Sequence, residues 1–393
     1  PAGVPLFPVT TANASTEEAM HTILTVNPGS TTTKIAAYRD ETPLFTETVE
    51  HRPEELAGKR IMEQFGLRRE TLARCLDTHG LRPGELSAVA ARGGKLPPLR
   101  RGAYRVNALM VETLRKHPVD EHASNLGAVL AYDLAEPLGI PAYIYDAVVT
   151  DEMDDVARFS GVPELPRRAS CHVLNMYAAA RKYAERTSRP PEETTVVIMH
   201  MGGGISGCAL LQGRMIDVLS DEEGPFSPER AGRVPCRQLV NLCFSGRLDH
   251  SAATRRMRGN GGLRAYLGTG SVLEVERRIA AGDAYAAQVY EAMAYQVAKG
   301  IGELATVLPG GPEAIILTGA IARSQTFTQL ITNRVRFLAQ VVIIPGENEM
   351  EALALGVLRV LRGEEPSREF RLTPPEGNPT WTDIPSGVAA FCF

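Results

Sequence analysis

Two short segments of this 393-residue chain combine glycine with hydroxyl-bearing side chains in a way that suits anion binding. Glycine lets a ligand approach the backbone closely, and Ser and Thr add hydroxyl donors. Successive N–H groups in such turns form a concave site for anions. The candidate residues are Asn27, Gly29, Ser30, Thr31, Thr32 and Thr33 in the first turn, and His200, Gly202, Gly203, Gly204 and Ser206 in the second. Either turn alone is also consistent with an ordinary hairpin.

The repetition of this pattern favours phosphate binding. Apolar, strand-like runs flank each turn, namely Ile23–Val26 and Ile35–Tyr38 for the first, and Val197–Met199 and Cys208–Leu211 for the second. We therefore predict two similar domains that present their turns to one polyphosphate. The second turn also matches the spacing G-x-G-x-x-G, but a dinucleotide fingerprint must open a helix. Because the chain continues here as a strand, we reject the dinucleotide interpretation.

Acidic side chains follow two further strand-like runs. Asp146 comes directly after Pro141–Tyr145, and Glu349 follows Val341–Ile344 after a short turn. Ligand groups in open α/β sheets gather at such strand ends. Magnesium takes one or two carboxylates together with phosphates and water. Asp146 and Glu349 are therefore the predicted magnesium ligands, although Glu349 could also be an acid that stabilises a helix N-terminus.

Composition narrows the class of protein. The formal net charge is −4, which gives no basic footprint for nucleic acid. No apolar run approaches the roughly 20 residues needed to span a membrane. The first 20 residues lack the basic and apolar regions of a secretory signal, and the six cysteines form no C-x-x-C pair. A cytoplasmic enzyme with reduced thiols is the expectation.

Six segments, in this order, resemble the butyrate kinase branch of the acetate kinase family, within the sugar kinase–Hsp70–actin fold group. They are residues 27–34, 91–94, 122–127, 200–206, 224–230 and 346–352. The resemblance implies an α/β fold of two similar lobes, each a mixed sheet flanked by helices, with the nucleotide between them. It assigns residues 21–150 to the first lobe, with helix 351–362 packing back on it, and residues 151–350 to the second. Residues 1–20 are expected to be a loosely ordered extension and residues 364–393 an irregular tail.

The resemblance implies reversible transfer of a phosphoryl group between ATP and a short-chain carboxylate, giving ADP and an acyl phosphate, with Mg²⁺. A carboxylate is already ionised at pH 7, so this acceptor needs no general base. It needs relief from repulsion by the triphosphate and in-line positioning. The resemblance gives these tasks to Arg92, near the acyl group, and to Arg230, facing the transferred phosphoryl group.

The remaining roles rest on the same resemblance. His172 would donate to the equatorial phosphoryl oxygens, and His122 and Asn125 would lie on the substrate side. Gly319, Ala320 and Ser324 would lie near the adenosine. Relatives usually carry a second glycine in place of Ala320, so its methyl group is expected either to crowd the adenosine or to require a small backbone shift. A homo-oligomer, a dimer or higher, is also expected.

Three alternatives stay open at this point. An acetate or propionate kinase would differ only in the acyl pocket. A sugar kinase would need a carboxylate base, which Asp146 could supply. An ATP-gated binding protein resembling the Hsp70 nucleotide domain would need a substrate-binding module, for which the chain after Gly363 is too short.

Overall fold

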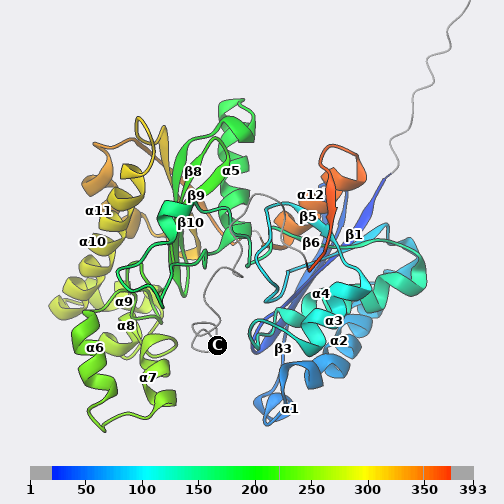
Figure 1. The fold of residues 1–393 in the computed structure, drawn as a ribbon, viewed down its shortest axis with the longest axis horizontal. Coiled ribbons are helices and arrows are strands. Elements are labelled where there is room, and N and C mark those ends of the chain that lie inside the picture. Colours follow the sequence, from blue (N-terminus) through cyan, green and yellow to red (C-terminus); the bar gives the residue numbers. More distant parts are fainter. Residues whose placement is uncertain (1–19, 221, 348, 373–393) are drawn as a thin grey trace, which may run out of the picture.

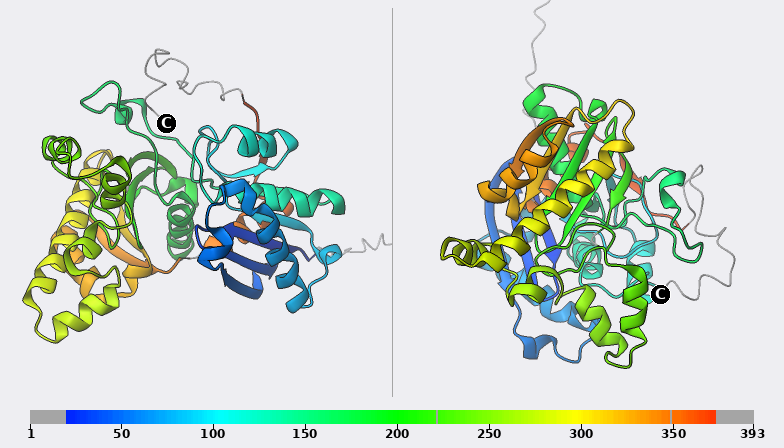
Figure 2. Two further views of the ribbon diagram at one scale, coloured as in Figure 1. Left: turned by 90° about the horizontal axis from the view of Figure 1, so that it is seen from below. Right: turned by 90° about the vertical axis from the view of Figure 1, so that its left-hand side faces the viewer.

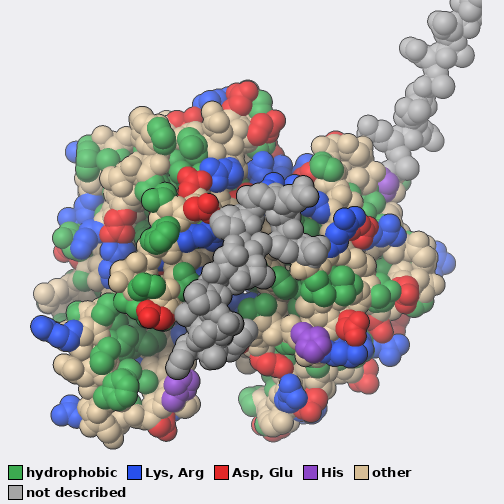
Figure 3. All heavy atoms as spheres, viewed as in Figure 1, with side chains coloured by type: hydrophobic (Ala, Val, Ile, Leu, Met, Phe, Trp, Pro, Cys, Tyr) green, Lys and Arg blue, Asp and Glu red, His purple; other side chains and the backbone are tan. Residues whose placement is uncertain are grey.

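The computed structural model describes residues 20–220, 222–347 and 349–372. The expectations for residues 1–19 and 373–393 lie outside this range. Within it, two β-sheets lie in separate halves of the molecule (Figure 1). The space-filling view shows a notch between the halves at its lower edge (Figure 3). No helix among the described residues is long and apolar enough to cross a membrane.

The first sheet has seven strands in the order β12-β5-β6-β4-β1-β2-β3. β1 pairs antiparallel with β2 and parallel with β4, and β4 continues in parallel with β6. The strands are β1 (Thr22–Pro28), β2 (Thr32–Arg39), β3 (Thr42–Glu50), β4 (Ala88–Ala91), β5 (Ala103–Arg105), β6 (Ala142–Tyr145) and β12 (Ser367–Glu369).

The second sheet has five strands in the order β11-β10-β7-β8-β9. They are β7 (Val196–Met201), β8 (Ile205–Leu211), β9 (Arg214–Leu219), β10 (Ala314–Gly319) and β11 (Gln340–Pro345). An antiparallel meander again passes into parallel strands, so β9-β8-β7-β10-β11 repeats the order β3-β2-β1-β4-β6. The two predicted strand–turn–strand units are thus the first hairpins of two sheets with the same topology.

Helices cover the faces of both sheets and bury their apolar residues. The helices are α1 (Pro53–Leu56), α2 (Phe65–Thr78), α3 (Ala108–Lys116), α4 (Asn125–Ala135), α5 (Val173–Thr187), α6 (Cys236–Cys243), α7 (His250–Met257), α8 (Gly262–Leu267), α9 (Val272–Ala280), α10 (Ala284–Thr306), α11 (Gln325–Val335) and α12 (Glu349–Leu361). α5 lies at the junction of the halves and packs on α12, which in turn packs on the first sheet (Figure 2). Burying one aliphatic side chain in such contacts is worth about 1.5–3 kcal/mol.

Two local expectations need correction. Apolar residues between Leu56 and Leu76 recur at spacings of three and four, which predicts one helix over Pro53–His79. The helix instead ends after α1, where Gly58 has φ of +71°, and a 3₁₀ turn at Ile61–Gln64 leads into α2. Within the segment from residue 364, which was expected to be irregular, Ser367–Glu369 forms β12 and pairs in parallel with β5. Three residues on the edge of a sheet carry too little apolar pattern to be recognised as a strand.

Candidate functional site

Glu349 joins three elements of the fold at the junction of the halves. Its carboxylate accepts hydrogen bonds from Asn27 Nδ2 at the end of β1 (2.6 Å) and from Asn175 Nδ2 on α5 (3.2 Å). Arg92, in the loop after β4, donates to it from a guanidinium nitrogen at 2.5 Å. Glu349 is 8% exposed. Burial would raise its pKa, but the charges of Arg92 and Lys34 outweigh burial and lower it. The structure therefore holds an ionised carboxylate here.

The first turn is held by a fully buried arginine. Arg68 of α2 donates to the carbonyl oxygens of Gly29 (2.8 Å), Ser30 (3.3 Å) and Thr32 (2.7 Å). In a trans peptide the N–H points opposite to the C=O. Since the Gly29 and Ser30 carbonyls face Arg68, the N–H groups of the next residues face away from it. Arg68 thus orients the turn with its donors outward, as an anion site requires.

Replacing Arg68 with methionine is expected to destabilise the protein by about 2–4 kcal/mol, because buried carbonyl groups lose their donor. The affinity for ATP should fall with it, since the turn loses its orientation. Urea unfolding and ATP titration would measure both effects. Arg69→Met on the same helix is the matched control, because Arg69 is 65% exposed and pairs only with Asp133 at 3.1 Å among the described contacts. An Arg68→Met protein with unchanged ATP affinity would contradict the assigned role.

The second turn ends beside two histidines. The His172 and His200 rings stack at a centroid distance of 4.3 Å, and His172 Nδ1 lies 2.7 Å from the Ser206 hydroxyl. Burial lowers the pKa of both rings, to about 4 for His200 and well below the usual value for His172, where His200 and Arg230 add to the effect. Both imidazoles are therefore neutral at pH 7 and act as hydrogen-bonding groups.

Arg230 lies directly against the second turn. Its guanidinium covers Gly204 so closely that a Cβ at that position would collide with it. Ser227 ties the arginine loop to the turn, because its hydroxyl donates to the Gly203 carbonyl at 2.8 Å and accepts from the Arg230 N–H at 3.2 Å. The predicted phosphoryl-facing arginine and the predicted glycine turn are thus in contact.

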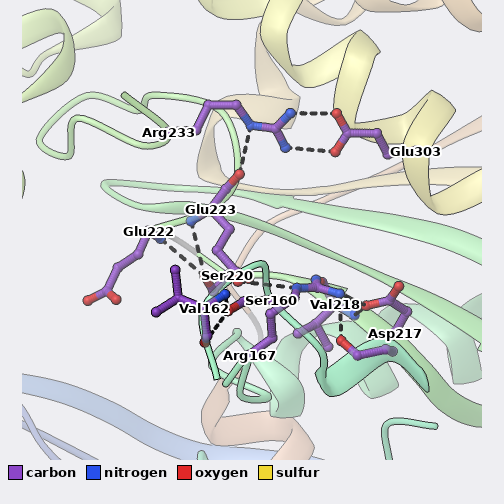
Figure 4. Close-up of polar contacts among 11 residues, drawn as sticks. Ser160, Val162, Arg167, Asp217, Val218, Ser220, Glu222, Glu223, Arg233 and Glu303 are labelled. Carbon is purple, nitrogen blue, oxygen red and sulfur yellow. Dashed lines mark hydrogen bonds and ion pairs between the residues drawn. The ribbon is translucent and has the colours of Figure 1, made fainter. Parts of the chain in front are cut away.

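The loop between β9 and α6, which carries Arg230, is braced on both sides (Figure 4). Arg233 binds Glu303 of α10 through two nitrogens, at 2.5 and 2.7 Å. Arg167 reaches Glu223 at 3.2 Å and Asp217 at 3.1 Å. These ion pairs fix the loop at its start and after Arg230, which limits how far the catalytic candidate can move.

Positive charge from both halves converges near His122. Arg230 and Arg258 form an antiparallel bridge pair, so their side chains stand on the same side of the backbone. Burial, then the charges of Lys95, Arg92 and Arg258, lower the pKa of His122 to about 4. Burial and Arg258 likewise lower the pKa of Lys95. Such a concentration of cations is stabilised by an anionic ligand.

Asn125 has a structural position. Its side-chain oxygen accepts from the Lys95 N–H at 2.7 Å, and its amide nitrogen donates to the Asp120 carbonyl at 2.8 Å. It therefore shapes the loop that carries Lys95, and its contact with substrate stays a prediction.

Asp146 belongs to a different cluster from Glu349. It is 4% exposed and accepts from the Gly102 N–H at 2.8 Å. Burial raises its pKa to about 6, against the lowering effect of the Gly102 hydrogen bond and of Arg181. Its neighbour Tyr145 contacts Arg181, Arg359 and Glu365. Among the residues that the structure describes, no hydrogen bond or ion pair joins Asp146 to Glu349, so a shared magnesium site stays a prediction.

The raised pKa of Asp146 gives a testable pH dependence. The folded state binds the proton more tightly than the unfolded chain, so the stability contributed by the neutral acid is present below about pH 4 and is lost as the pH rises through about 6. Asp146→Asn should therefore be more stable than wild type at pH 7, by at most about 3 kcal/mol, and equal to it near pH 4. Urea unfolding from pH 4 to 8 measures this. A difference that does not change with pH would contradict the assignment.

The predicted adenosine residues lie at the end of β10 and directly after it. Gly319 has φ of +91°, and a Cβ there would collide with the Met201 backbone, so only glycine fits. Ala320 is exposed, and its backbone does not require glycine. Ser324 caps α11 through the Phe327 N–H at 3.0 Å and donates to Glu276. These contacts are structural, and nucleotide binding by the three residues stays a prediction.

The chain is similar to several known proteins. The model of the acetokinase family matches residues 164–350. Butyrate kinase 2 of Clostridium acetobutylicum is 46% identical over 352 residues, covering 89% of this chain and 99% of that protein. A probable butyrate kinase 2 of Caldanaerobacter subterraneus subsp. tengcongensis is 46% identical over 348 residues, covering 88% and 98%.

Solved structures share the fold. The acetate kinase of Porphyromonas gingivalis has a TM-score of 0.71 at 18% identity, covering 87% of this chain and all of that one. A propionate kinase of Francisella tularensis has a TM-score of 0.68 at 16% identity, covering 86% and 99%. The predicted fold class, α/β of the sugar kinase–Hsp70–actin type, is confirmed.

Proposed function

This chain belongs to the acetokinase family, and we propose that it is an ATP-dependent kinase of butyrate or of a branched four- to five-carbon acid. The reaction is reversible and gives ADP and an acyl phosphate. The observation that carries the proposal is the convergence of Arg92 from one half and Arg230 from the other on the stacked rings of His172 and His200, where both arginines add to the effect of burial in lowering the pKa of each ring. The acyl group comes from the 46% identity to the butyrate kinases.

Arg92 and Arg230 would neutralise different charges, Arg92 on the acceptor carboxylate and Arg230 on the transferred phosphoryl group. One carboxylate oxygen of the acid forms a bond to the γ-phosphorus while the bond from that phosphorus to the β,γ-bridging oxygen breaks, and no proton moves. Glu349 holds one nitrogen of Arg92 and so fixes its orientation, leaving its other N–H groups for the acceptor carboxylate. Arg230 would neutralise charge on the transferred group.

His172 would donate to the same phosphoryl group from Nε2. The Ser206 hydroxyl accepts the His172 backbone N–H at 3.3 Å, and it can therefore direct its own proton to Nδ1. That arrangement places the ring proton on Nε2. Because the ring is neutral at pH 7, it supplies a donor and no net charge.

Glu349 fits a magnesium ion, because it is a buried and ionised carboxylate beside the first turn. Bound there, the ion would neutralise phosphate charge. We also propose that the halves act as the two lobes given by residues 21–150 with 351–362 and residues 151–350. We place the reaction in the cytoplasm and expect a homo-oligomer, which light scattering of the purified protein would test.

Hydroxylamine trapping with ATP, Mg²⁺ and a series of acids tests the proposal. Acyl hydroxamate formation from acetate, propionate, butyrate, isobutyrate and valerate should peak at four or five carbons. A peak at acetate or propionate would keep the chemistry and overturn the acyl assignment. No hydroxamate from any of the acids would overturn the proposed reaction.

A further inference from the structure

A second cluster of ligand-type side chains lies between β3 and α2. Glu47 of β3 faces Cys75 and His79, which are four residues apart and lie on one side of the helix end. His79 Nε2 lies 2.9 Å from Glu47 Oε2, and Cys75 Sγ lies 3.2 Å from the same oxygen. The three ligand atoms all lie within 4.8 Å of one another. A carboxylate, an imidazole and a thiol are the groups from which zinc sites are built.

The imidazole is already oriented. Phe45, two residues before Glu47 on the same face of β3, stacks on His79 with ring centroids 4.0 Å apart and planes 3° apart. The stacked ring directs Nε2 at Glu47 and the Cys75 thiol. A ligand held in this way loses little conformational freedom when a metal ion binds.

The charges of the cluster also suit a cation. The Glu47 carboxylate supplies an anionic ligand atom, and Cys75 Sγ and His79 Nε2 both lie within hydrogen-bond distance of the same oxygen. A cysteine binds a metal ion as the thiolate, so the Cys75 proton leaves when a cation binds. The Glu47 and His79 side chains are 38% and 33% exposed, which leaves one side of the cluster open to a water molecule.

We propose that Glu47, Cys75 and His79 form a zinc site with water as the fourth ligand. Binding replaces the thiol proton: Cys75–SH and Zn²⁺ give a Cys75 thiolate–zinc bond and one proton released to solvent. The imidazole binds through Nε2, so the proton that Nε2 donates to Glu47 moves through solvent to Nδ1, and the carboxylate binds through an oxygen. The neutral imidazole and the carboxylate therefore keep their proton counts, and only the thiol releases a proton. The site would join β3 to α2, the helix that carries Arg68, and it is independent of the phosphoryl-transfer site.

Cobalt titration of the full-length protein, freed of metal and with its thiols reduced, tests the site. We expect one Co²⁺ per chain with the near-ultraviolet thiolate-to-cobalt band of a sulfur ligand, and displacement by Zn²⁺. Calorimetry in buffers of different ionisation enthalpy should record about one proton released per ion. Because the expected readouts are absorption and heat, they do not depend on kinase activity.

Variants distinguish cobalt binding at this site from cobalt binding at other cysteines. Cys75→Ser should lose the cobalt band, and Glu47→Gln, at a half-exposed position, should weaken Co²⁺ binding while keeping the fold. The double variant Cys236→Ser with Cys243→Ser is the matched control, since both thiols are exposed on α6. The absence of a band in wild type, its persistence in Cys75→Ser or its loss in the control would overturn the proposal.

Discussion

Arg230→Ala is expected to lower kcat by about 10³–10⁵-fold, the range found when an arginine at a transferred phosphoryl group is lost. The reason is geometric. The guanidinium lies against Gly204 of the second turn, and the ion pairs Arg233–Glu303 and Arg167–Glu223 hold its loop in place. The affinity for ATP should change little, since the turns supply the backbone donors. Steady-state kinetics and ATP titration separate the two effects.

Two further variants make this prediction specific. Arg230→Lys should recover only part of the rate, because an ammonium lacks the planar fork of the guanidinium. Arg237→Ala on the exposed face of α6 is the matched control and should keep wild-type kinetics. The assigned role of Arg230 is wrong if Arg230→Ala stays within a few-fold of wild-type kcat.

Glu349→Gln is expected to lower kcat/KM by about 10²–10³-fold. The substitution keeps the size of the side chain but removes the charge that holds Arg92, Asn27 and Asn175 together. One amide N–H₂ group must then face these donors. The Mg²⁺ concentration needed for half-maximal rate should rise as well, which a purely structural role would not produce.

Glu351→Gln gives the control from the same helix. Its carboxylate pairs with Lys182 at 2.6 Å and is 38% exposed, so its loss should have little effect. Circular dichroism would show whether each variant folds, and Glu349→Asp provides a second test if Glu349→Gln does not. Unchanged kcat/KM and Mg²⁺ dependence in a folded Glu349→Gln protein would contradict the account.

The two turns could be predicted from the sequence because glycine and hydroxyl residues interrupt strong apolar periodicity there. The two turns align without a gap when Asn27 is matched with His200, but their structures differ in one respect. Asn27 pairs with Lys34, whereas His200 pairs with Ser206, so the hairpin registers differ by one residue. Strand register depends on pairing geometry that a single strand does not encode.

The supporting residues could not be predicted. Arg68 and Asn175 lie on helices far along the chain from the groups they hold, and nothing in their local sequence marks them. Lys95 and Arg258 can be recognised as neighbouring charges only when the two halves are placed together in the fold. Asp146, in contrast, is marked by the sequence, because its position after a strand is typical of a ligand. In the structure its surroundings are Gly102, Arg181 and Glu365.

The most direct test of the central claim follows an oxygen atom. With butyrate labelled by ¹⁸O in both carboxylate oxygens, attack on the γ-phosphorus leaves one labelled oxygen between carbon and phosphorus. Hydroxylamine then attacks the carbonyl carbon and releases phosphate that keeps this oxygen. We predict phosphate with one ¹⁸O, formed in equal amount with ADP and butyryl hydroxamate. Unlabelled phosphate without hydroxamate would mean that water is the acceptor, and it would contradict the account.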